Sequence, residues 1–396
     1  MAARVADVTR TVERFAAARL RELEHDGLLR VPDDGRARAS AMEAAARAGV
    51  EFVDASSNDY LGLAGWDVSR ETGVQHSGLG AGSSRLIHGT RAAHLAIESS
   101  LAAWTCLPAA LLFTSGYAAN VGLVSALART GAVVVSDQLN HASIIDGCRL
   151  GRADVVVVPH LDVGAIERAL RAGAALPQRW LIVESCYSMD GDGPDLVELR
   201  RICDRHEAGL IVDEAHALGV FGPDGAGRCA AVGVVPDALV GTLGKSVGSQ
   251  GAFVAGSDAL RTLLWNDARS FVFSTAPSPR LAEQSLLHVE RVRAANDKRA
   301  SVFRYAGELR AALASNGIST SDTLGGPIVP VVVGGNERAL AVVAELARIG
   351  VLAQAIRPPT VPTGTARVRL TVTAGWPEDA PTRVAAAVAR ALSQHP

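Results

Sequence analysis

Short apolar runs alternate with helical segments through the middle of the chain, and this alternation constrains the fold most strongly. The pattern predicts strands at Val133–Ser136, Val155–Pro159, Trp180–Glu184, Leu210–Asp213, Ala238–Thr242 and Gly251–Ala255. Alternation of this kind is typical of a mostly parallel central sheet covered by helices on both faces. The sequence therefore predicts an α/β fold, and such sheets bind ligands at the carboxyl ends of their strands.

A lysine and an acid are predicted to meet at that edge of the sheet. Lys245 comes shortly after one predicted strand, whereas Asp213 ends another and His216 follows three positions later. Desolvation lowers the pKa of a lysine, as a lysine that forms a Schiff base requires. This is the layout of a pyridoxal-phosphate site, in which the acid pairs with the pyridinium nitrogen of the cofactor and the lysine holds its aldehyde.

The same residues allow two other interpretations. An acid that ends a strand is often a helix N-cap, and a Gly-Lys pair is often a surface turn. The segments Asp213–His216 and Gly244–Ser246 also spell an acidic box and the end of a P-loop, which would suggest an ATPase. The P-loop pattern requires glycine where Leu239 stands, and the acidic box precedes the supposed phosphate loop, so the sequence disfavours an ATPase.

Length and composition limit the class of protein. A chain of 396 residues is long enough for an N-terminal helix and arm at 1–50, a large α/β domain at 51–290 and a smaller α+β domain at 291–396. The formal net charge of −2 gives no basic excess for binding nucleic acid. Since no apolar run reaches the roughly 18 residues of a membrane span and no signal-peptide core is present, we expect a cytoplasmic protein without a membrane partner. The five cysteines have no C-x-x-C spacing, so we expect no metal site.

Several small or polar residues stand at predicted helix starts and strand ends. Gly116 and Tyr117 open a helix, whose free N–H groups bind phosphate. Thr242 offers a hydroxyl three positions before the lysine. His141 heads another helix and is placed to stack on a planar ring, although a solvated histidine is the commoner reason for such a position. Phe271–Phe273 is predicted to be a strand that leads to a hydroxyl pair.

Two arginines of a predicted strand, Arg367 and Arg369, should share one face, because alternate strand residues point the same way. A guanidinium group binds a carboxylate through two parallel hydrogen bonds. A solvated edge strand is the ordinary alternative for such a pair.

These motifs together resemble the α-oxoamine synthase family of fold-type I pyridoxal-phosphate enzymes. The similarity spans about residues 58–373 and includes SNDYLGL, SGYAAN, NHAS, SMDGD, VDEAHALG, TLGKSVGSQG and IRPPTVPTGTARVRL. The resemblance implies that Lys245 holds the cofactor covalently and that Asp213 pairs with its pyridinium nitrogen. It also implies that His216 contacts the ring hydroxyl and that His141 stacks on the ring beside the substrate.

The resemblance implies further contacts with cofactor and substrates. The residues implied to surround pyridoxal phosphate are Gly116, Tyr117, Ser188 and Thr242. Ser274 and Thr275 would reach the phosphate of the neighbouring subunit, which would make a homodimer obligatory. The residues implied to bind substrate are Arg369 for the amino-acid carboxylate, Arg357 and Thr360 for the acyl group, and Arg30 in the N-terminal arm, where Leu29 is the residue that aligns.

The segment IRPPTVP is the most diagnostic, because sister enzymes keep the valine-proline and lose the Arg-Pro-Pro. It implies the branch that condenses L-alanine with a pimeloyl thioester, of coenzyme A or acyl-carrier protein, during biotin biosynthesis. The alternatives are glycine C-acetyltransferase, 5-aminolevulinate synthase and serine palmitoyltransferase, which share the lysine site and differ in their substrates.

Overall fold

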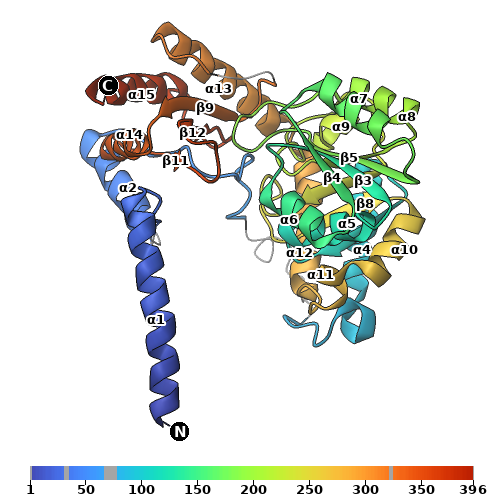
Figure 1. Ribbon diagram of the computed structural model, residues 1–396. Helices are drawn as coiled ribbons and strands as arrows, with labels where there is room; N and C mark the ends of the chain where they lie inside the picture. Colours follow the sequence, from blue (N-terminus) through green and yellow to red (C-terminus); the bar gives the residue numbers. More distant parts are fainter. Residues whose placement is uncertain (1, 31–34, 67–77, 321–323, 396) are drawn as a thin grey trace.

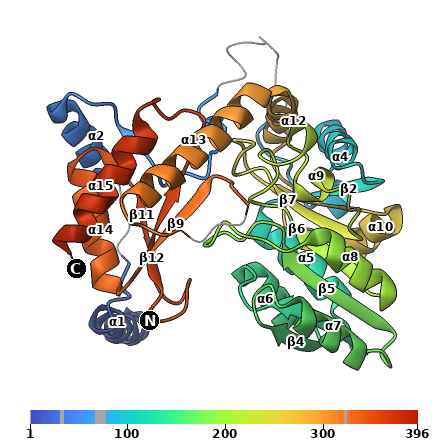
Figure 2. The ribbon, with the colours of Figure 1, turned by 90° about the horizontal axis from the view of Figure 1, so that it is seen from above.

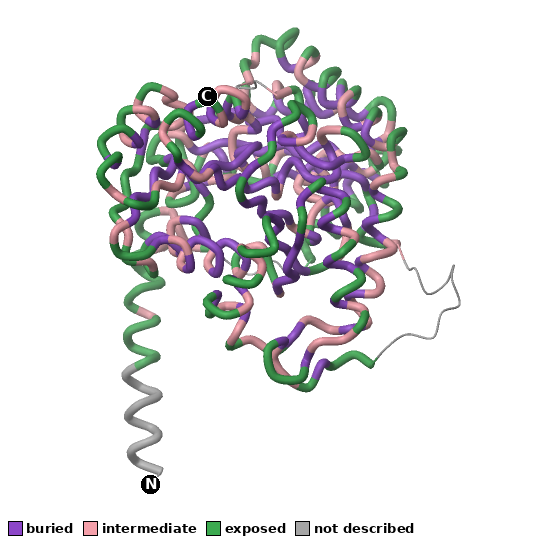
Figure 3. Tube along the Cα trace, turned by 90° about the vertical axis from the view of Figure 1, so that its right-hand side faces the viewer, coloured by how far each residue is buried: buried purple, intermediate pink, exposed green. Residues whose placement is uncertain are grey.

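Two lobes and one protruding helix make up the molecule. The structure is a computed structural model that describes residues 2–30, 35–66, 78–320 and 324–395, with only the backbone described for residues 2–11. Figure 1 shows a larger lobe around a central sheet, a smaller C-terminal lobe, and helix α1 (Ala2–His25) extending away from the smaller lobe. In Figure 3 the buried residues concentrate inside the two lobes, whereas the described part of α1 is mostly exposed.

The large lobe contains a seven-stranded sheet in the order β2-β8-β7-β6-β5-β3-β4. Its strands are β2 (Ala109–Phe113), β3 (Ala132–Asp137), β4 (Asp154–Val158), β5 (Gln178–Glu184), β6 (Gly209–Asp213), β7 (Ala238–Thr242) and β8 (Ala252–Gly256). Strands β3 to β7 pair in parallel, whereas β8 runs antiparallel to both β7 and β2. The predicted α/β fold with a mostly parallel sheet is confirmed.

Helices cover both faces of this sheet, as the alternating pattern predicted. They are α4 (Ala92–Thr105), α5 (Gly116–Leu127), α6 (Ala142–Leu150), α7 (Val163–Ala172), α8 (Leu196–Arg205), α9 (Arg228–Ala231), α10 (Asp258–Asp267), α11 (Arg269–Val272) and α12 (Pro279–Ala294), with short turns η1 (Arg85–Gly89) and η2 (Pro223–Gly225). Successive strand residues point to opposite faces of the sheet and pack in different cores. Leu111 packs in the core with α5 and α6, and Leu112 packs in the core with α4 and α12. Burying each such side chain contributes about 2 kcal/mol.

The smaller lobe is an α+β unit around a three-stranded antiparallel sheet, ordered β11-β12-β9. Its elements are α13 (Asn296–Ser315), β9 (Ile328–Gly334), α14 (Asn336–Arg348), β10 (Val351–Leu352), β11 (Gln354–Ile356), β12 (Ala366–Thr371) and α15 (Ala380–Gln394). Figure 2 shows α2 (Arg36–Ala48), α14 and α15 together on this lobe.

The N-terminal segment joins the smaller lobe through backbone contacts. Strand β1 (Val53–Asp54) pairs in parallel with β10. Gly350 has a positive φ of 80°, and a Cβ atom there would lie 2.6 Å from the Cβ of Ala45 in α2, so the close approach requires glycine. The domain boundaries near residues 50 and 290 stay a prediction.

One predicted strand is wrong. Residues 269–272 form the short helix α11 and not the strand predicted at Phe271–Phe273. The aromatic run suggested a strand, but the Phe271 ring packs 5.5 Å from that of Phe113 and 5.1 Å from that of Trp265. Tertiary packing of one buried aromatic residue has therefore overridden the local pattern. Within the described residues, no helix is both long enough and apolar enough to span a membrane.

Candidate active site

Lys245 and Asp213 come together at the carboxyl edge of the sheet, as the sequence predicted. Asp213 ends β6, opposite Val240 in the neighbouring strand β7, and the turn after β7 carries the lysine. Burial lowers the pKa of Lys245 to about 8, against the opposing charges of Asp213 and Glu184. More of this amine is therefore neutral near pH 7 than of an ordinary lysine, and the neutral form is the nucleophile.

The Asp213 carboxylate is buried and held at both oxygens. Its Oδ2 accepts a hydrogen bond from Asn120 Nδ2 at 2.7 Å, and its Oδ1 accepts one from the Ala215 N–H at 2.8 Å. Asn120 lies on the buried face of α5, in the SGYAAN motif, and sequence reasoning gave it no role. Its place among apolar residues of a predicted helix could have indicated a role, because a buried amide needs a hydrogen-bond partner.

His216 lies between the lysine and a tyrosine. Its Nε2 is 2.8 Å from Lys245 Nζ, and its Nδ1 is 2.6 Å from the Tyr60 hydroxyl. Burial and the neighbouring lysine hold the pKa of His216 well below its ordinary value, so the ring is neutral. Burial also raises the pKa of Tyr60, which keeps its proton. Sequence reasoning included Tyr60 only as a letter in the SNDYLGL motif.

Several hydrogen-bond donors gather where α5 begins. A Cβ atom added to Gly116 would lie 3.9 Å from Thr242 Oγ1, so that hydroxyl lies beside the first turn of the helix. Ser115 caps the helix by accepting from the Ala118 N–H at 3.1 Å. The first N–H groups of the helix and the Thr242 hydroxyl are donors suited to a phosphate. Tyr117 is half exposed, and its hydroxyl donates to Asp146 of α6.

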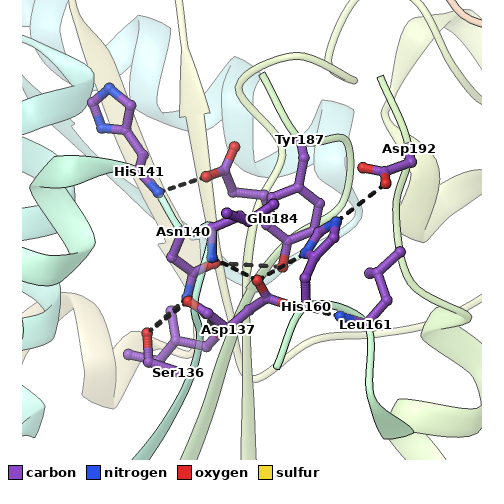
Figure 4. A network of polar contacts seen from close by, with 11 residues as sticks. Ser136, Asp137, Asn140, His141, His160, Leu161, Glu184, Tyr187 and Asp192 are labelled. Atoms are coloured by element: carbon purple, nitrogen blue, oxygen red, sulfur yellow. Dashed lines mark hydrogen bonds and ion pairs between the residues drawn. The ribbon is translucent and has the colours of Figure 1, made fainter. Parts of the chain in front are cut away.

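His141 occupies the N-cap of α6, and the residue as a whole is exposed. Its backbone N–H donates to Glu184 Oε1 at 2.6 Å, and its Nδ1 lies 2.8 Å from Ser143 Oγ. Figure 4 shows the ring pointing away from Glu184. Burial, followed by the charge of Asp213, raises the pKa of Glu184 to about 8. Glu184 is thus a second titrating group beside the lysine that sequence reasoning did not place in the site.

The two arginines of β12 share one face, as predicted, but they differ in their ion pairs. Arg367 pairs with Asp190. The Arg369 guanidinium instead contacts Asn58 Oδ1 from both terminal nitrogens at 3.0 Å and donates from Nε to the Ser188 carbonyl at 2.7 Å. Among the described residues no carboxylate forms an ion pair with this buried guanidinium, which therefore suits a carboxylate ligand.

A cavity of about 520 Å³ opens between the start of α6, the loop after β5 and the loop before β12. Thr360 and Ser188 line it. Arg30 donates to Thr360 Oγ1 at 3.2 Å, and Arg357 donates to the Gly27 carbonyl at 2.7 Å, so the end of the N-terminal helix and its arm lie against this loop. Arg357 and Thr360, predicted for the acyl group, thus lie near Arg30 of the N-terminal arm, and the contacts of all three with substrate stay predictions.

Ser274 and Thr275 lie at a different place from the lysine. They line a small cavity with Arg85 and Thr114, and Thr275 forms an isolated β-bridge with Ser84. Their contact with a neighbouring subunit stays a prediction.

The residues at the sheet edge fit pyridoxal phosphate. The amine of Lys245 suits the aldehyde, the fixed carboxylate of Asp213 suits the pyridinium nitrogen, and the start of α5 with Thr242 suits the phosphate. A Cβ atom at Gly116 would meet only Thr242, at 3.9 Å, so the space beside the start of α5 is open.

Comparisons with known proteins agree with this geometry. Residues 50–388 match the family model for aminotransferase class I and II. The chain is 43% identical over 366 residues to the 8-amino-7-oxononanoate synthase of Anaeromyxobacter dehalogenans, an alignment that covers 91% of each chain. The chain belongs to the 8-amino-7-oxononanoate synthase family.

Solved structures place this family within a shared fold. The serine palmitoyltransferase of Sphingomonas wittichii superposes with a TM-score of 0.81 at 28% identity, over 87% of this chain and 88% of that one. The 8-amino-7-oxononanoate synthase of Francisella tularensis, with a TM-score of 0.73 and 21% identity over 87% and 98% of the two chains, shows the fold alone. The family resemblance and the transferase class predicted from the sequence are confirmed, and membership supports the predicted cofactor.

Proposed function

We propose that this chain condenses L-alanine with a pimeloyl thioester and releases carbon dioxide and the free thiol, forming 8-amino-7-oxononanoate for biotin biosynthesis. The observation that carries the proposal is the half-buried Lys245 amine, 2.8 Å from neutral His216 at the sheet edge where Asp213 ends β6. The 43% identity to a named relative supports the choice of substrates. When bound, pyridoxal phosphate supplies an aldehyde and a ring that stabilises negative charge on the amino-acid α-carbon.

The chain's own residues manage the proton transfers. Lys245 Nζ, whose pKa of about 8 lies close to neutral pH, is suited to remove the α-proton of L-alanine. Asp213, fixed by Asn120, favours a proton on the pyridine nitrogen because a nearby anion stabilises the charged form. Neutral His216, whose Nε2 lies 2.8 Å from Lys245 Nζ, is placed to orient the amine through a hydrogen bond.

Arg369 is proposed to bind the carboxylate of L-alanine. Its guanidinium is 4% exposed and is oriented by Asn58 and by the Ser188 carbonyl, so a bidentate carboxylate needs little further ordering. His141 is proposed to cover the cofactor ring and to contact substrate from the start of α6.

The acyl thioester is proposed to enter the cavity of about 520 Å³. Arg30, Arg357 and Thr360 lie together at its edge and would contact the acyl chain, whose far end is a carboxylate. The carrier of that chain is coenzyme A or acyl-carrier protein.

A homodimer with shared active sites is part of this proposal. Ser274 and Thr275 would reach the phosphate in the partner's site. Apolar side chains exposed near them support such an interface: Phe273 is 72% exposed and Ile87 is 75% exposed.

One assay tests the proposed reaction. The purified protein is supplied with pyridoxal phosphate, with L-alanine, glycine or L-serine, and with pimeloyl-CoA, pimeloyl-acyl-carrier protein or a long-chain acyl-CoA, and products are identified by mass. We expect 8-amino-7-oxononanoate from L-alanine with one carrier preferred. The serine palmitoyltransferase-type alternative, which the 0.81 TM-score favours as second candidate, predicts turnover with L-serine and a long-chain thioester instead.

A further inference from the structure

His160 lies between two acidic side chains at the edge of the active site. Its Nδ1 is 2.9 Å from Asp137 Oδ1, and its Nε2 is 3.1 Å from Asp192 Oδ2 (Figure 4). An ionised carboxylate only accepts hydrogen bonds, so both ring nitrogens must carry protons to satisfy this geometry. The ring is therefore an imidazolium that ties two carboxylates together.

The two acids belong to different parts of the fold. Asp137 ends β3 and also accepts the N–H groups of Leu139 at 2.8 Å and of Leu161 at 2.9 Å, so it is fixed to the sheet. Asp192 lies within the loop that follows β5, and its other oxygen, Oδ1, is buried with no partner among the described residues. His160 is thus the side chain that attaches the Asp192 carboxylate to the rigid sheet.

The loop Tyr187–Asp192 is closed on itself and carries substrate-binding groups. The Tyr187 N–H donates to the Asp192 carbonyl at 2.8 Å, which joins the ends of the loop. Between them, the Ser188 carbonyl accepts from Arg369 Nε at 2.7 Å. Moving Asp192 would therefore move the carbonyl that orients the arginine.

His160 also contacts the support of His141. The His160 ring packs edge-on against the Tyr187 ring, with centroids 4.4 Å apart. The hydroxyl of Tyr187 reaches Asn140 Oδ1 at 3.5 Å, and Asn140 precedes His141 and donates to the Ile182 carbonyl at 2.8 Å. The same ring thus supports both sides of the cavity.

Electrostatics agree with this geometry. Burial by itself lowers the pKa of the His160 ring, but the hydrogen bonds and charges of Asp137 and Asp192 outweigh burial and raise that pKa to about 10. The titratable groups that face the ring are these two acids and Tyr187, whose pKa is itself raised well above its ordinary value by burial.

We propose that His160 is a positioning residue, which bridges Asp137 and Asp192 and thereby holds the loop Tyr187–Asp192 where Arg369 can bind the amino-acid carboxylate. This inference rests on the proposed function for the identity of the amino acid. It gives His160 no contact with substrate, and it predicts an effect on amino-acid binding that a purely stabilising residue would not have.

The test compares His160→Gln with a matched control, His206→Gln. His206 also pairs with a carboxylate, Glu167 at 3.2 Å, and its side chain is 14% exposed against 16% for His160, but it precedes β6 at the opposite edge of the sheet. We measure the KM of each substrate, the Kd of L-alanine without thioester, and amide hydrogen exchange of the loop in the cofactor-loaded protein.

We expect His160→Gln to raise the KM and Kd of L-alanine about tenfold, to change the KM of the thioester less than about twofold, and to speed exchange at residues 187–192. The control should leave all of these values within about twofold of the wild type. Asp192→Asn, which removes the charge at the other end of the bridge, should shift the same values in the same direction even if His160→Gln does not fold.

Two results would overturn the inference. One is an equal rise in the KM of both substrates, and the other is unchanged loop exchange with unchanged L-alanine binding. Loop exchange and amino-acid binding are measured without turnover, so they report on His160 even if the chain prefers glycine or L-serine. In that case the proposed function fails, and the Kd of the preferred amino acid is compared between the wild type and His160→Gln.

Discussion

Two histidines at the same edge of the sheet differ in charge: His216 is neutral and His160 is positively charged. His216 has Lys245 at 2.8 Å on one side and the Tyr60 hydroxyl on the other, and its pKa lies well below the ordinary value. His160 has a carboxylate on each side, and its pKa is raised to about 10. Burial opposes the charged form in both, so the neighbours decide the protonation state. The neutral ring of His216 lies beside the lysine that is proposed to react, and the charged ring of His160 is proposed to hold the loop Tyr187–Asp192.

The largest effect should come from the lysine beside the neutral ring. Lys245→Ala removes the amine that bonds the cofactor and takes the α-proton, so turnover should fall by at least about 10⁴-fold. Product formation measured by mass checks this expectation. Some cofactor should remain bound through its phosphate, and undiminished activity would contradict the assignment of Lys245.

A smaller loss should follow from neutralising the acid beside the lysine. Asp213→Asn leaves the hydrogen-bonding shape near Asn120 but removes the charge that favours a protonated ring nitrogen, so kcat should fall about 100-fold. Steady-state kinetics with saturating L-alanine measure it. Asn120→Ala, which keeps the charge and loses only its anchor, is the matched control and should cost about tenfold or less.

The charge of His160 should make the free energy of unfolding depend on pH. The pKa of His160 is about 10 in the folded chain and about 6.5 when unfolded, so the folded state binds the extra proton between these values. The stability that His160 adds is complete below about pH 6.5 and is lost as pH rises through about 10. Denaturant unfolding of wild type and His160→Gln should differ most at pH 6 and converge above pH 10. A constant difference across this range would contradict the charged bridge.

The smallest effect concerns the residue next to the charged ring. Leu161 has a left-handed φ of 56°, held by the hydrogen bond from its N–H to Asp137. Asparagine tolerates this conformation better than leucine, so Leu161→Asn should stabilise the chain by about 0.5–1 kcal/mol. Thermal unfolding measures the change. Leu161→Ala keeps the strained backbone and should bring no such gain.

The sequence predicted the sheet and the meeting of Lys245 with Asp213, because neighbouring parallel strands end at one edge. It did not predict that Asn120 would hold Asp213 or that Tyr60 would reach His216, since these contacts join residues far apart in the chain. The sequence around His160 did not indicate its role, because its two acidic partners come from strand β3 and from the loop after β5. The strand predicted near Phe271 failed for a related reason, since its aromatic ring packs against distant elements as part of a helix.

The most direct test of the central claim is chemical trapping at the lysine. The wild-type protein loaded with pyridoxal phosphate is treated with borohydride, digested and sequenced by mass spectrometry. We expect the cofactor to be fixed to the peptide that contains Lys245, and prior addition of L-alanine to protect this peptide from labelling. Label on another residue, or no label on a protein that binds the cofactor, would contradict it.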